Sequence, residues 1–257
     1  SSLYELLKFR ILHKGAIRSS KQKQEFSDLV VSEMSIVSSS NFENFEIQKN
    51  HKLFQSYYLT NAGDYKSALS SFYELNDTFE KNKHLLSNPP IYYLMTIEGV
   101  LESLRAVKNY DAMSYFISQL ENIKTTSQHF KIQIQCVAFL YKLFPFLDLG
   151  LCPEAKTLID ENKEDLYDKT NLLIPARQAQ LFLNTALIYI GTKEFTKARK
   201  FISQIMMSER NIFALPLYRT IRLVNLMILY EMKEFDYIES EVRSVKREIQ
   251  NKERMYQ

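Results

Sequence analysis

The stretch Phe54–Leu75, FQSYYLTNAGDYKSALSSFYEL, decides the fold that we expect for this chain. On each side of Gly63, apolar and aromatic residues recur at spacings of three and four, which is the pattern of an amphipathic helix. Glycine often lies just after the end of a helix, and here it separates the two patterns. The stretch therefore predicts two helices joined by a tight turn, which together form one helical hairpin.

The composition agrees with a helical protein that has a substantial core. Of the 257 residues, 46% are hydrophobic, and only 5 are Gly and 6 are Pro. A sheet-rich domain of this size needs many tight turns and normally contains more of both residues. Charged residues make up 25% of the chain and the net charge is +3, which gives no reason to expect a nucleic-acid or acidic-membrane partner.

The cysteine content and the hydropathy pattern point to a cytoplasmic protein. Cys136 and Cys152 are too few for a disulfide framework and lack the paired spacing of a metal site, so we expect reduced thiols. The most apolar run, residues 136–151, contains a lysine, a proline and an aspartate. It is also shorter than the roughly 20 residues that a membrane helix requires, and we therefore expect no membrane span.

The opening hairpin sets a register that repeats along the chain. Ala68 of its second helix serves as the marker, and equivalent positions follow at intervals of 40 to 45 residues. An aromatic or comparable residue lies three positions before each marker, and a large apolar residue lies four positions after it. The five sets are Tyr65, Ala68 and Phe72; Tyr110, Met113 and Ile117; Cys152, Ala155 and Ile159; Phe195, Ala198 and Ile202; and Phe235, Ile238 and Val242. This register predicts five helical hairpins.

Helix-breaking residues follow the same register, which is independent support for it. Glycines fall between the two helices of a hairpin, and prolines fall between hairpins, where proline suits the first turn of the next helix. These residues are Gly63, Gly150 and Gly191, and Pro89, Pro90, Pro175 and Pro216, with residues 125–128 as a further break. Pro153 also suits a first turn, whereas Pro145 should kink or interrupt its helix.

The first 40 residues predict a separate helix pair. Ser2 and Glu5 have the spacing of a capping box at the start of its first helix. The linker, residues 13–24, carries four basic residues and no acid. It could contact phosphate, but such a run is more often a solvated loop and helix start, and no aromatic residues accompany it. Asn41 is a suitable N-cap for the next helix, which we expect to end near Asn61.

A single hairpin cannot bury both of its apolar faces, so neighbouring hairpins should stack into an array. The expected fold is all-α, an α-solenoid of about five to six antiparallel helix pairs. We expect one solenoid over residues 1–257. The first helix of each hairpin, called a first helix below, should lie on its concave face. The parts of the solenoid are the helix pair of residues 1–40 and hairpin units over residues 41–88, 89–126, 127–170, 171–210 and 211–257.

The hairpins resemble tetratricopeptide repeats (TPR), whose units place a small residue and an aromatic in the first helix and an alanine in the second. The positions that carry this resemblance are Phe182, Ala186, Tyr189, Phe195 and Ala198, and in the opening unit Ser56, Gly63, Tyr65, Ala68 and Phe72. The resemblance covers the architecture of residues 41–250, although the period exceeds the 34 residues of the family. It implies a right-handed solenoid that binds a peptide or protein in its concave groove. The paired Lys, Asn and Arg side chains with which some members hold a C-terminal tail have no counterpart here.

The groove-facing positions of the first helices are mixed to acidic in character. They are Tyr57, Asn61, Glu98, Glu102, Arg105, Tyr141, Asp148, Asn184, Tyr230 and Glu231. Exposed tyrosines in this set would anchor a peptide, because tyrosine offers a large contact area at low entropic cost. Glu98 and Glu102, one turn apart, could receive a cationic partner or do acid–base chemistry, although a solvated face with Arg105 as counter-ion also explains them. Gly99 between them indicates that another helix approaches closely.

We find no catalytic, cofactor or metal site in the sequence. His129 and Cys136 would lie on one side of a helix, but two turns separate them by about 10 Å, too far for a hydrogen bond. Cys136 is therefore interpreted as a buried structural thiol. The other histidines are scattered along the chain. The sequence favours a non-enzymatic scaffold that binds a protein or peptide over an enzyme on a helical frame.

The C-terminal segment predicts a further amphipathic helix. Ile238, Val242, Val245 and Ile249 form its apolar seam, and no helix-stop residue follows before Gln257. The helix either caps the array or continues into a coiled coil, which would make a dimer, or into another domain. If the helix continues, the alternative function is that of the ligand- or peptide-sensing portion of a larger regulatory protein, such as a transcriptional regulator.

Overall fold

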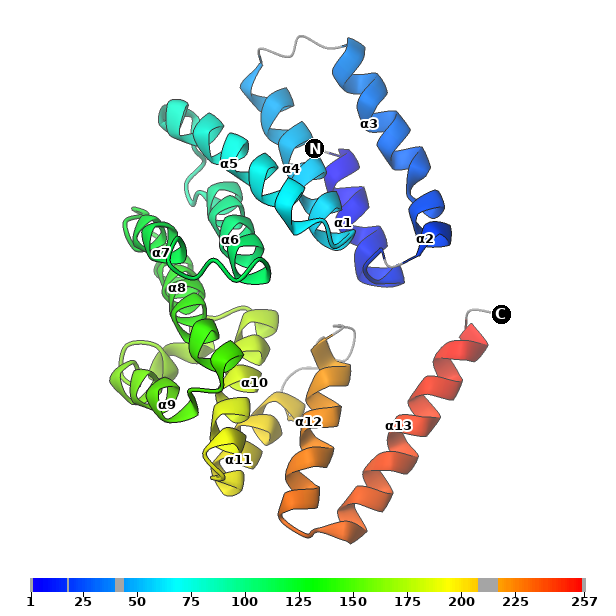
Figure 1. The fold of residues 1–257 in the computed structure, drawn as a ribbon, viewed down its shortest axis with the longest axis vertical. Helices are drawn as coiled ribbons and strands as arrows, with labels where there is room; N and C mark the ends of the chain where they lie inside the picture. The colour runs from blue at the N-terminus through cyan, green and yellow to red at the C-terminus, as the bar shows by residue number, and fades with distance from the viewer. Residues whose placement is uncertain (1, 18, 40–43, 208–216, 256–257) are drawn as a thin grey trace. The chain divides into compact units, whose positions relative to one another are not determined.

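The structure is a computed structural model that describes residues 2–17, 19–39, 44–207 and 217–255. Over these residues the chain is helical and contains no strand, which confirms the all-α prediction (Figure 1). It divides into two compact units, the N-terminal unit Ser1–Pro145 and the C-terminal unit Phe146–Gln257. A single solenoid over the whole chain stays a prediction.

Helices in the N-terminal unit are consecutive along the chain and mostly joined by short turns. They are α1 (Ser2–Lys14), α2 (Ser20–Glu25), α3 (Ser27–Ser39), α4 (Phe45–Asn61), α5 (Tyr65–Lys81), the short 3-10 helix η1 (Lys83–Leu85), α6 (Ile91–Ala106), α7 (Met113–Glu121) and most of α8 (Gln128–Leu149). The C-terminal unit holds the end of α8, α9 (Cys152–Glu161), the 3-10 helix η2 (Tyr167–Leu172), α10 (Pro175–Gly191), α11 (Phe195–Met206), α12 (Leu217–Glu231) and α13 (Phe235–Met255).

Within each unit the helices pack in adjacent pairs. In the N-terminal unit α4 packs on α5, α5 on α6 and α6 on α7. In the C-terminal unit the chain of contacts runs from α9 to α10, α11, α12 and α13. First helices also touch the next first helix, since α4 contacts α6 and α10 contacts α12. This is the packing expected of stacked hairpins.

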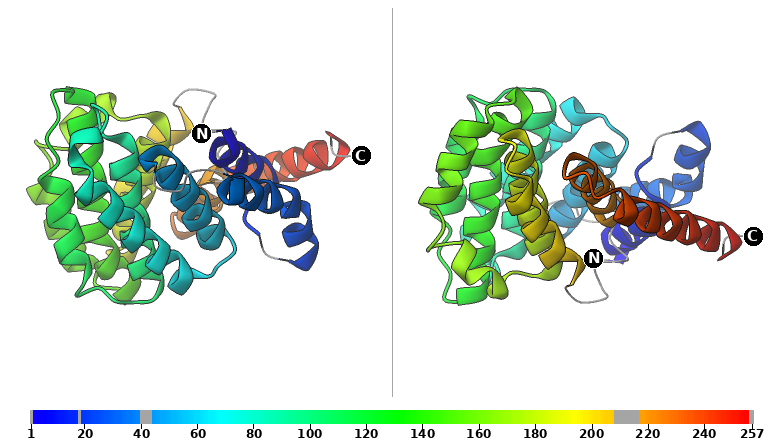
Figure 2. Two further views of the ribbon diagram at one scale, coloured as in Figure 1. Left: turned by 90° about the horizontal axis from the view of Figure 1, so that it is seen from above. Right: turned by 90° about the horizontal axis from the view of Figure 1, so that it is seen from below.

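The predicted register marks the core of these hairpins. The markers Ala68, Met113, Ala155 and Ala198 are buried, as are the large residues four positions after each of them. The fifth set is different, because Ile238 and Val242 of α13 are only half-buried. Figure 1 shows why: α12 and α13 run antiparallel from their shared turn and splay apart along their length. Both views of Figure 2 show α13 as a long helix that extends past α12.

All five hairpin turns have the same backbone geometry. One residue in each adopts the left-handed conformation, with φ between 59° and 79°. The residue after it donates its N–H to the carbonyl five positions earlier, at 2.8 to 3.0 Å, as in a Schellman motif. The left-handed residues are Gly63, Lys108, Gly150, Lys193 and Lys233. The turns therefore repeat at the predicted interval, although lysine occupies three of the five positions.

Two glycines in helices are explained by close approach of a neighbour. A Cβ atom on Gly99 would lie 2.2 Å from the ring of Phe72, so any side chain there would force this ring to shift. This confirms the close approach predicted at Gly99. A Cβ atom on Gly191 would lie 2.2 Å from the Sγ atom of Cys152. Gly191, which we expected between the two helices of its hairpin, is the last residue of α10, and the left-handed residue of that turn is Lys193.

Other predicted breaks have mixed outcomes. Pro153 lies in the first turn of α9 and Pro175 in that of α10, as expected. The helix α8 continues through Pro145, so the expected interruption does not occur. Asn41 and Pro216 lie outside the described residues; Asn44 caps α4, which ends at Asn61 as predicted.

Residues 2–17 and 19–39 hold three helices, α1, α2 and α3, where the sequence predicted a pair. The basic linker already becomes helical at Ser20, and the buried ring of Phe26 separates α2 from α3. Ser19 caps α2 by accepting a hydrogen bond from the N–H of Gln22. A side chain that satisfies the first free N–H groups is what starts a helix in so polar a segment.

Candidate functional site

Three predicted site residues meet in the N-terminal unit, on α6 and α8. The Tyr141 hydroxyl donates to Oε2 of Glu102 at 3.1 Å. The Arg105 guanidinium lies 3.8 Å from the centre of the Phe144 ring, and that ring packs edge-on against Tyr141. Glu102 and Arg105 are half-buried, whereas Tyr141 is only 4% exposed. We call these four residues, together with Glu98, the α6–α8 face.

The local sequence of α6 explains how this face is presented. Its fully buried residues, Ile97, Val100, Leu101 and Leu104, form the side that packs into the unit. Glu98, Glu102 and Arg105 follow one another at spacings of four and three on another side, where they reach solvent. The Tyr141 ring is not an exposed anchor, contrary to the sequence-based expectation. Its buried side chain instead holds the Glu102 carboxylate in place through the hydroxyl hydrogen bond.

The chain's own first helix covers Tyr57, one of the two predicted groove positions of α4. Tyr4 of α1 packs edge-on against Tyr57, with ring centres 5.8 Å apart, and against Tyr92 of α6 at 6.4 Å. Burial raises the pKa of Tyr4 far above its usual range, and the neighbouring Tyr57 and Glu5 add to the rise. Burial also raises the pKa of Tyr57. Tyr57 is therefore half-buried beneath α1.

Asn61 has a structural task at the end of α4. Its Nδ2 donates to the Tyr57 carbonyl at 2.8 Å, and its own carbonyl accepts the Ile17 N–H at 2.9 Å. It lines a pocket of about 580 Å³ whose other wall includes Ala16, Ile17, Ser19 and Lys23. Lys23 contributes a basic group to this pocket. The contacts of Asn61 fix the chain that leaves α1.

The remaining predicted residues lie in the C-terminal unit and are not brought together as one set. Asp148 is exposed near the end of α8. Asn184 is half-buried, and its Nδ2 donates to the Gln180 carbonyl of the same helix. Tyr230 and Glu231 are exposed at the end of α12, where they line a pocket of about 560 Å³.

Two exposed apolar residues of α12 were not among the predicted set. Leu223 and Met227 are 59% and 54% exposed, and with Tyr230 they form an apolar row. The spacing of four and three was a signal in the sequence. It was hidden because α12 is apolar on most sides, so the sequence could not tell the buried row from the exposed one.

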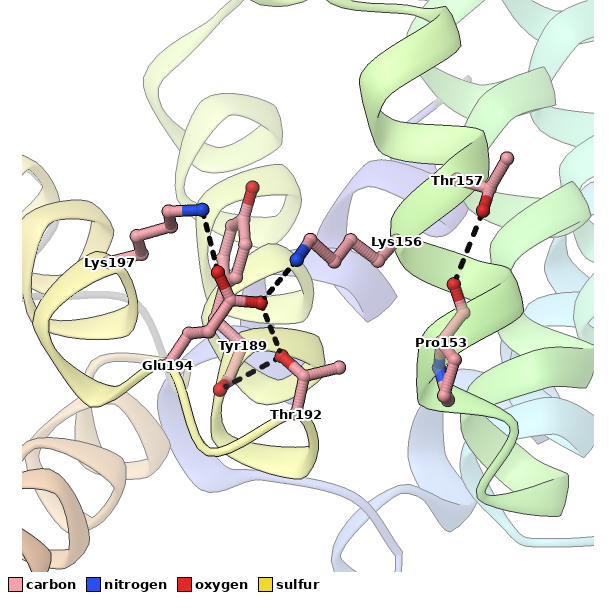
Figure 3. Close-up of polar contacts among 7 residues, drawn as sticks. All are labelled: Pro153, Lys156, Thr157, Tyr189, Thr192, Glu194 and Lys197. Carbon is pink, nitrogen blue, oxygen red and sulfur yellow. Dashed lines mark hydrogen bonds and ion pairs between the residues drawn. The ribbon is translucent and has the colours of Figure 1, made fainter.

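No pattern in the sequence indicated the ion network at Glu194 (Figure 3). The Glu194 carboxylate accepts hydrogen bonds from Lys156 of α9 and Lys197 of α11, both at 2.6 Å, and from the Thr192 hydroxyl at 3.0 Å. These bonds lower the pKa of Glu194 to about 2. Glu234, at the equivalent turn position, pairs in the same way with Arg199 of the preceding hairpin. These acids tie consecutive hairpins together.

Groups typical of metal or nucleophilic sites are not clustered. Within the described residues, no set of three or more His, Cys, Asp or Glu side chains is arranged to hold a metal ion. Cys136 is fully buried, as predicted, while His129 is exposed. In that same part of the chain, α8 is the one helix long and apolar enough to cross a membrane, and 56% of its apolar window is buried inside the protein. One such helix is weak support for a membrane span, although the sequence predicted none.

Comparison of the chain with protein-family models, with curated proteins and with solved structures gives no match. The tetratricopeptide resemblance therefore stays a resemblance that rests on the residues quoted above.

Proposed function

We propose that this protein is a non-enzymatic scaffold that binds a peptide or protein segment on its α6–α8 face. The observation that carries the proposal is the meeting of Glu102, Arg105 and Tyr141 from two different first helices. Their contacts hold the polar groups of the face in a fixed geometry. A binding surface gains affinity from such preorganisation, because less motion is lost when the partner arrives.

The charge of the α6–α8 face favours a partner with basic side chains. Glu98 and Glu102 are half-exposed and one helical turn apart, and like charges at that spacing weakly destabilise a helix. A lysine or arginine of a bound segment would offset that repulsion. The Arg105 guanidinium is held on the Phe144 ring and lies at one end of the face. We infer that the ligand is a segment that contains lysine or arginine.

The repeated hairpins support the same function. Their turns share one geometry, and adjacent helices pack in pairs within each unit. Stacked helix pairs build extended surfaces from their first helices, which is how such arrays bind partners. We propose that the hairpins follow the right-handed solenoid arrangement of tetratricopeptide proteins, with first helices on the concave side.

Peptide display tests the proposal directly, because the selection itself identifies the sequences that bind. Random peptides of about a dozen residues are selected on the intact protein, and their affinities are measured by fluorescence anisotropy. We expect the selected peptides to be rich in lysine or arginine. The double change Glu98→Gln/Glu102→Gln should weaken their binding about tenfold, equivalent to about 1.4 kcal/mol.

A matched variant controls for loss of charge elsewhere. Asp77 is an exposed acid on α5 of the same unit, so Asp77→Asn should change affinity less than about twofold. The proposal is overturned if the selected peptides lack basic residues, or if they bind the Glu98→Gln/Glu102→Gln variant as tightly as the native protein.

A further inference from the structure

One side of α12 carries a row of large apolar side chains that are open to solvent. Leu223, Met227 and Tyr230 are 59%, 54% and 64% exposed. Their spacing of four and three aligns them along the helix over about 10 Å. Single exposed hydrophobic residues are common on proteins, whereas aligned ones mark interaction surfaces. We call these three residues the α12 stripe.

A pocket extends the α12 stripe sideways. It has a volume of about 560 Å³ and is formed by residues of α10, α11, α12 and α13 and by Lys193 of the α10–α11 turn. Met227 and Tyr230 belong to both the stripe and the pocket, and Phe195 and Ile238 contribute further apolar walls. A pocket of this size and lining can receive a large apolar side chain. The row and the pocket therefore form one continuous apolar surface.

Basic groups lie at both ends of this surface. Arg219 is exposed one turn before Leu223 on the same side of α12, and Lys193 is exposed at the rim of the pocket. The acid at the rim is Glu231. A partner that carries acidic side chains beside its apolar ones would complement the two cations.

We propose that the α12 stripe and its pocket bind an acidic amphipathic helix of a partner protein. A helix satisfies its own backbone hydrogen bonds, whereas an extended segment would press unpaired N–H and C=O groups against Leu223 and Met227. Apolar residues at helical spacing would pack along the stripe, and one large side chain would enter the pocket beside Tyr230. This surface belongs to the C-terminal unit and does not rest on peptide binding at the α6–α8 face.

A display library of amphipathic helices tests this proposal on the whole protein. The library fixes leucines at helical spacing and varies the flanking positions between glutamate and lysine. We expect glutamate-flanked helices to be selected, and Leu223→Asp or Met227→Asp to reduce their affinity at least about tenfold. Arg219→Glu should weaken the glutamate-flanked helices and strengthen the lysine-flanked ones, since it reverses the charge at one end of the stripe.

Control variants separate this result from misfolding and from other occupants. Ile174→Asp introduces the same charge at another exposed apolar residue of the C-terminal unit and should leave affinity unchanged. All variants should keep the native circular dichroism spectrum, because the substituted side chains are exposed. Equal selection of lysine-flanked helices, or binding unaffected by Leu223→Asp, would overturn the proposal. Sedimentation that shows self-association abolished by Leu223→Asp would also overturn it, in favour of a second copy of this chain.

Discussion

The helices α6 and α12 occupy the same place in two hairpins but present opposite chemistry. On α6, the residues ten, six and three positions before the left-handed turn residue Lys108 are Glu98, Glu102 and Arg105. On α12, the residues at the same distances before the turn residue Lys233 are Leu223, Met227 and Tyr230. The repeat thus places different side chains at equivalent positions. On this difference rest our two proposals, a basic segment for the α6–α8 face and an acidic amphipathic helix for the α12 stripe.

The two helices also differ in the contacts that their buried sides make with neighbouring helices. α12 is tied to α13 by an ion pair between Arg222 and Glu241, whose side chains are 9% and 15% exposed. α6 is seated on α5 by the absence of a side chain at Gly99, which leaves room for the Phe72 ring. An ion pair supports the α12 stripe and close packing supports the α6–α8 face, so the two should respond to different changes.

Removing the charge beneath α12 should have the largest effect on stability. In Glu241→Gln, the nearly buried Arg222 guanidinium loses its counter-charge, and we expect a loss of about 3 kcal/mol in the free energy of unfolding. Urea denaturation measures this. Glu239→Gln breaks the well-exposed pair with Arg243 and should cost less than about 1 kcal/mol. Equal effects of the two changes would show that Arg222 is solvated.

A methyl group at Gly99 tests the packing beneath α6. Alanine is a better helix former than glycine by about 1 kcal/mol, so an open site would be stabilised. Here the new Cβ meets three atoms of the Phe72 ring, and we expect Gly99→Ala to be net destabilising by about 1 to 2 kcal/mol. The smaller side chain of Phe72→Leu in the same background should reduce the penalty. A stabilised Gly99→Ala protein would contradict the packing described here.

The smallest expected effect concerns the turns, where the two units also differ. Asp64 of the N-terminal unit caps its own helix, whereas Glu194 reaches back to Lys156 of α9 in the preceding hairpin. The folded-state pKa of Glu194 is about 2, below its ordinary value of 4.5. The ionised Glu194 carboxylate therefore stabilises the folded state above about pH 4.5, and this stabilisation is lost as the pH falls toward about 2.

Thermal melts between about pH 5 and pH 2 check this. Glu194→Gln should flatten the fall in Tm over that range, and added salt should shrink the difference, because the group is close to solvent. Glu154→Gln, which changes an exposed acid in the first turn of α9, serves as the control. An acid profile of Glu194→Gln that matches the native profile would show that the Lys156 and Lys197 contacts add nothing.

Much of the fold could be predicted from local patterns. The Ala68 register located the buried residue of four second helices, because helical periodicity depends only on neighbours in the chain. The turn position after α6 was missed, since Lys108 carries no preference for the left-handed conformation. Its conformation is imposed by the two helices that it joins.

The candidate site was predicted only in part for a similar reason. Glu102 and Tyr141 were both expected on first helices, but their hydrogen bond joins residues 39 positions apart. The exposure of Tyr141 was predicted wrongly, because a tyrosine at a first-helix position can turn inward or outward with the same sequence pattern.

The sequence by itself determined the helices of the five hairpins, their pairing and the interval of the repeat, since hydrogen bonds within a helix and across a tight turn involve residues only a few positions apart. The tertiary structure alone decided which side of an apolar helix such as α12 stays exposed, that α1 covers Tyr57, and which acids reach the neighbouring hairpin. Those outcomes depend on contacts between segments distant in sequence, and a pattern within one segment does not contain them.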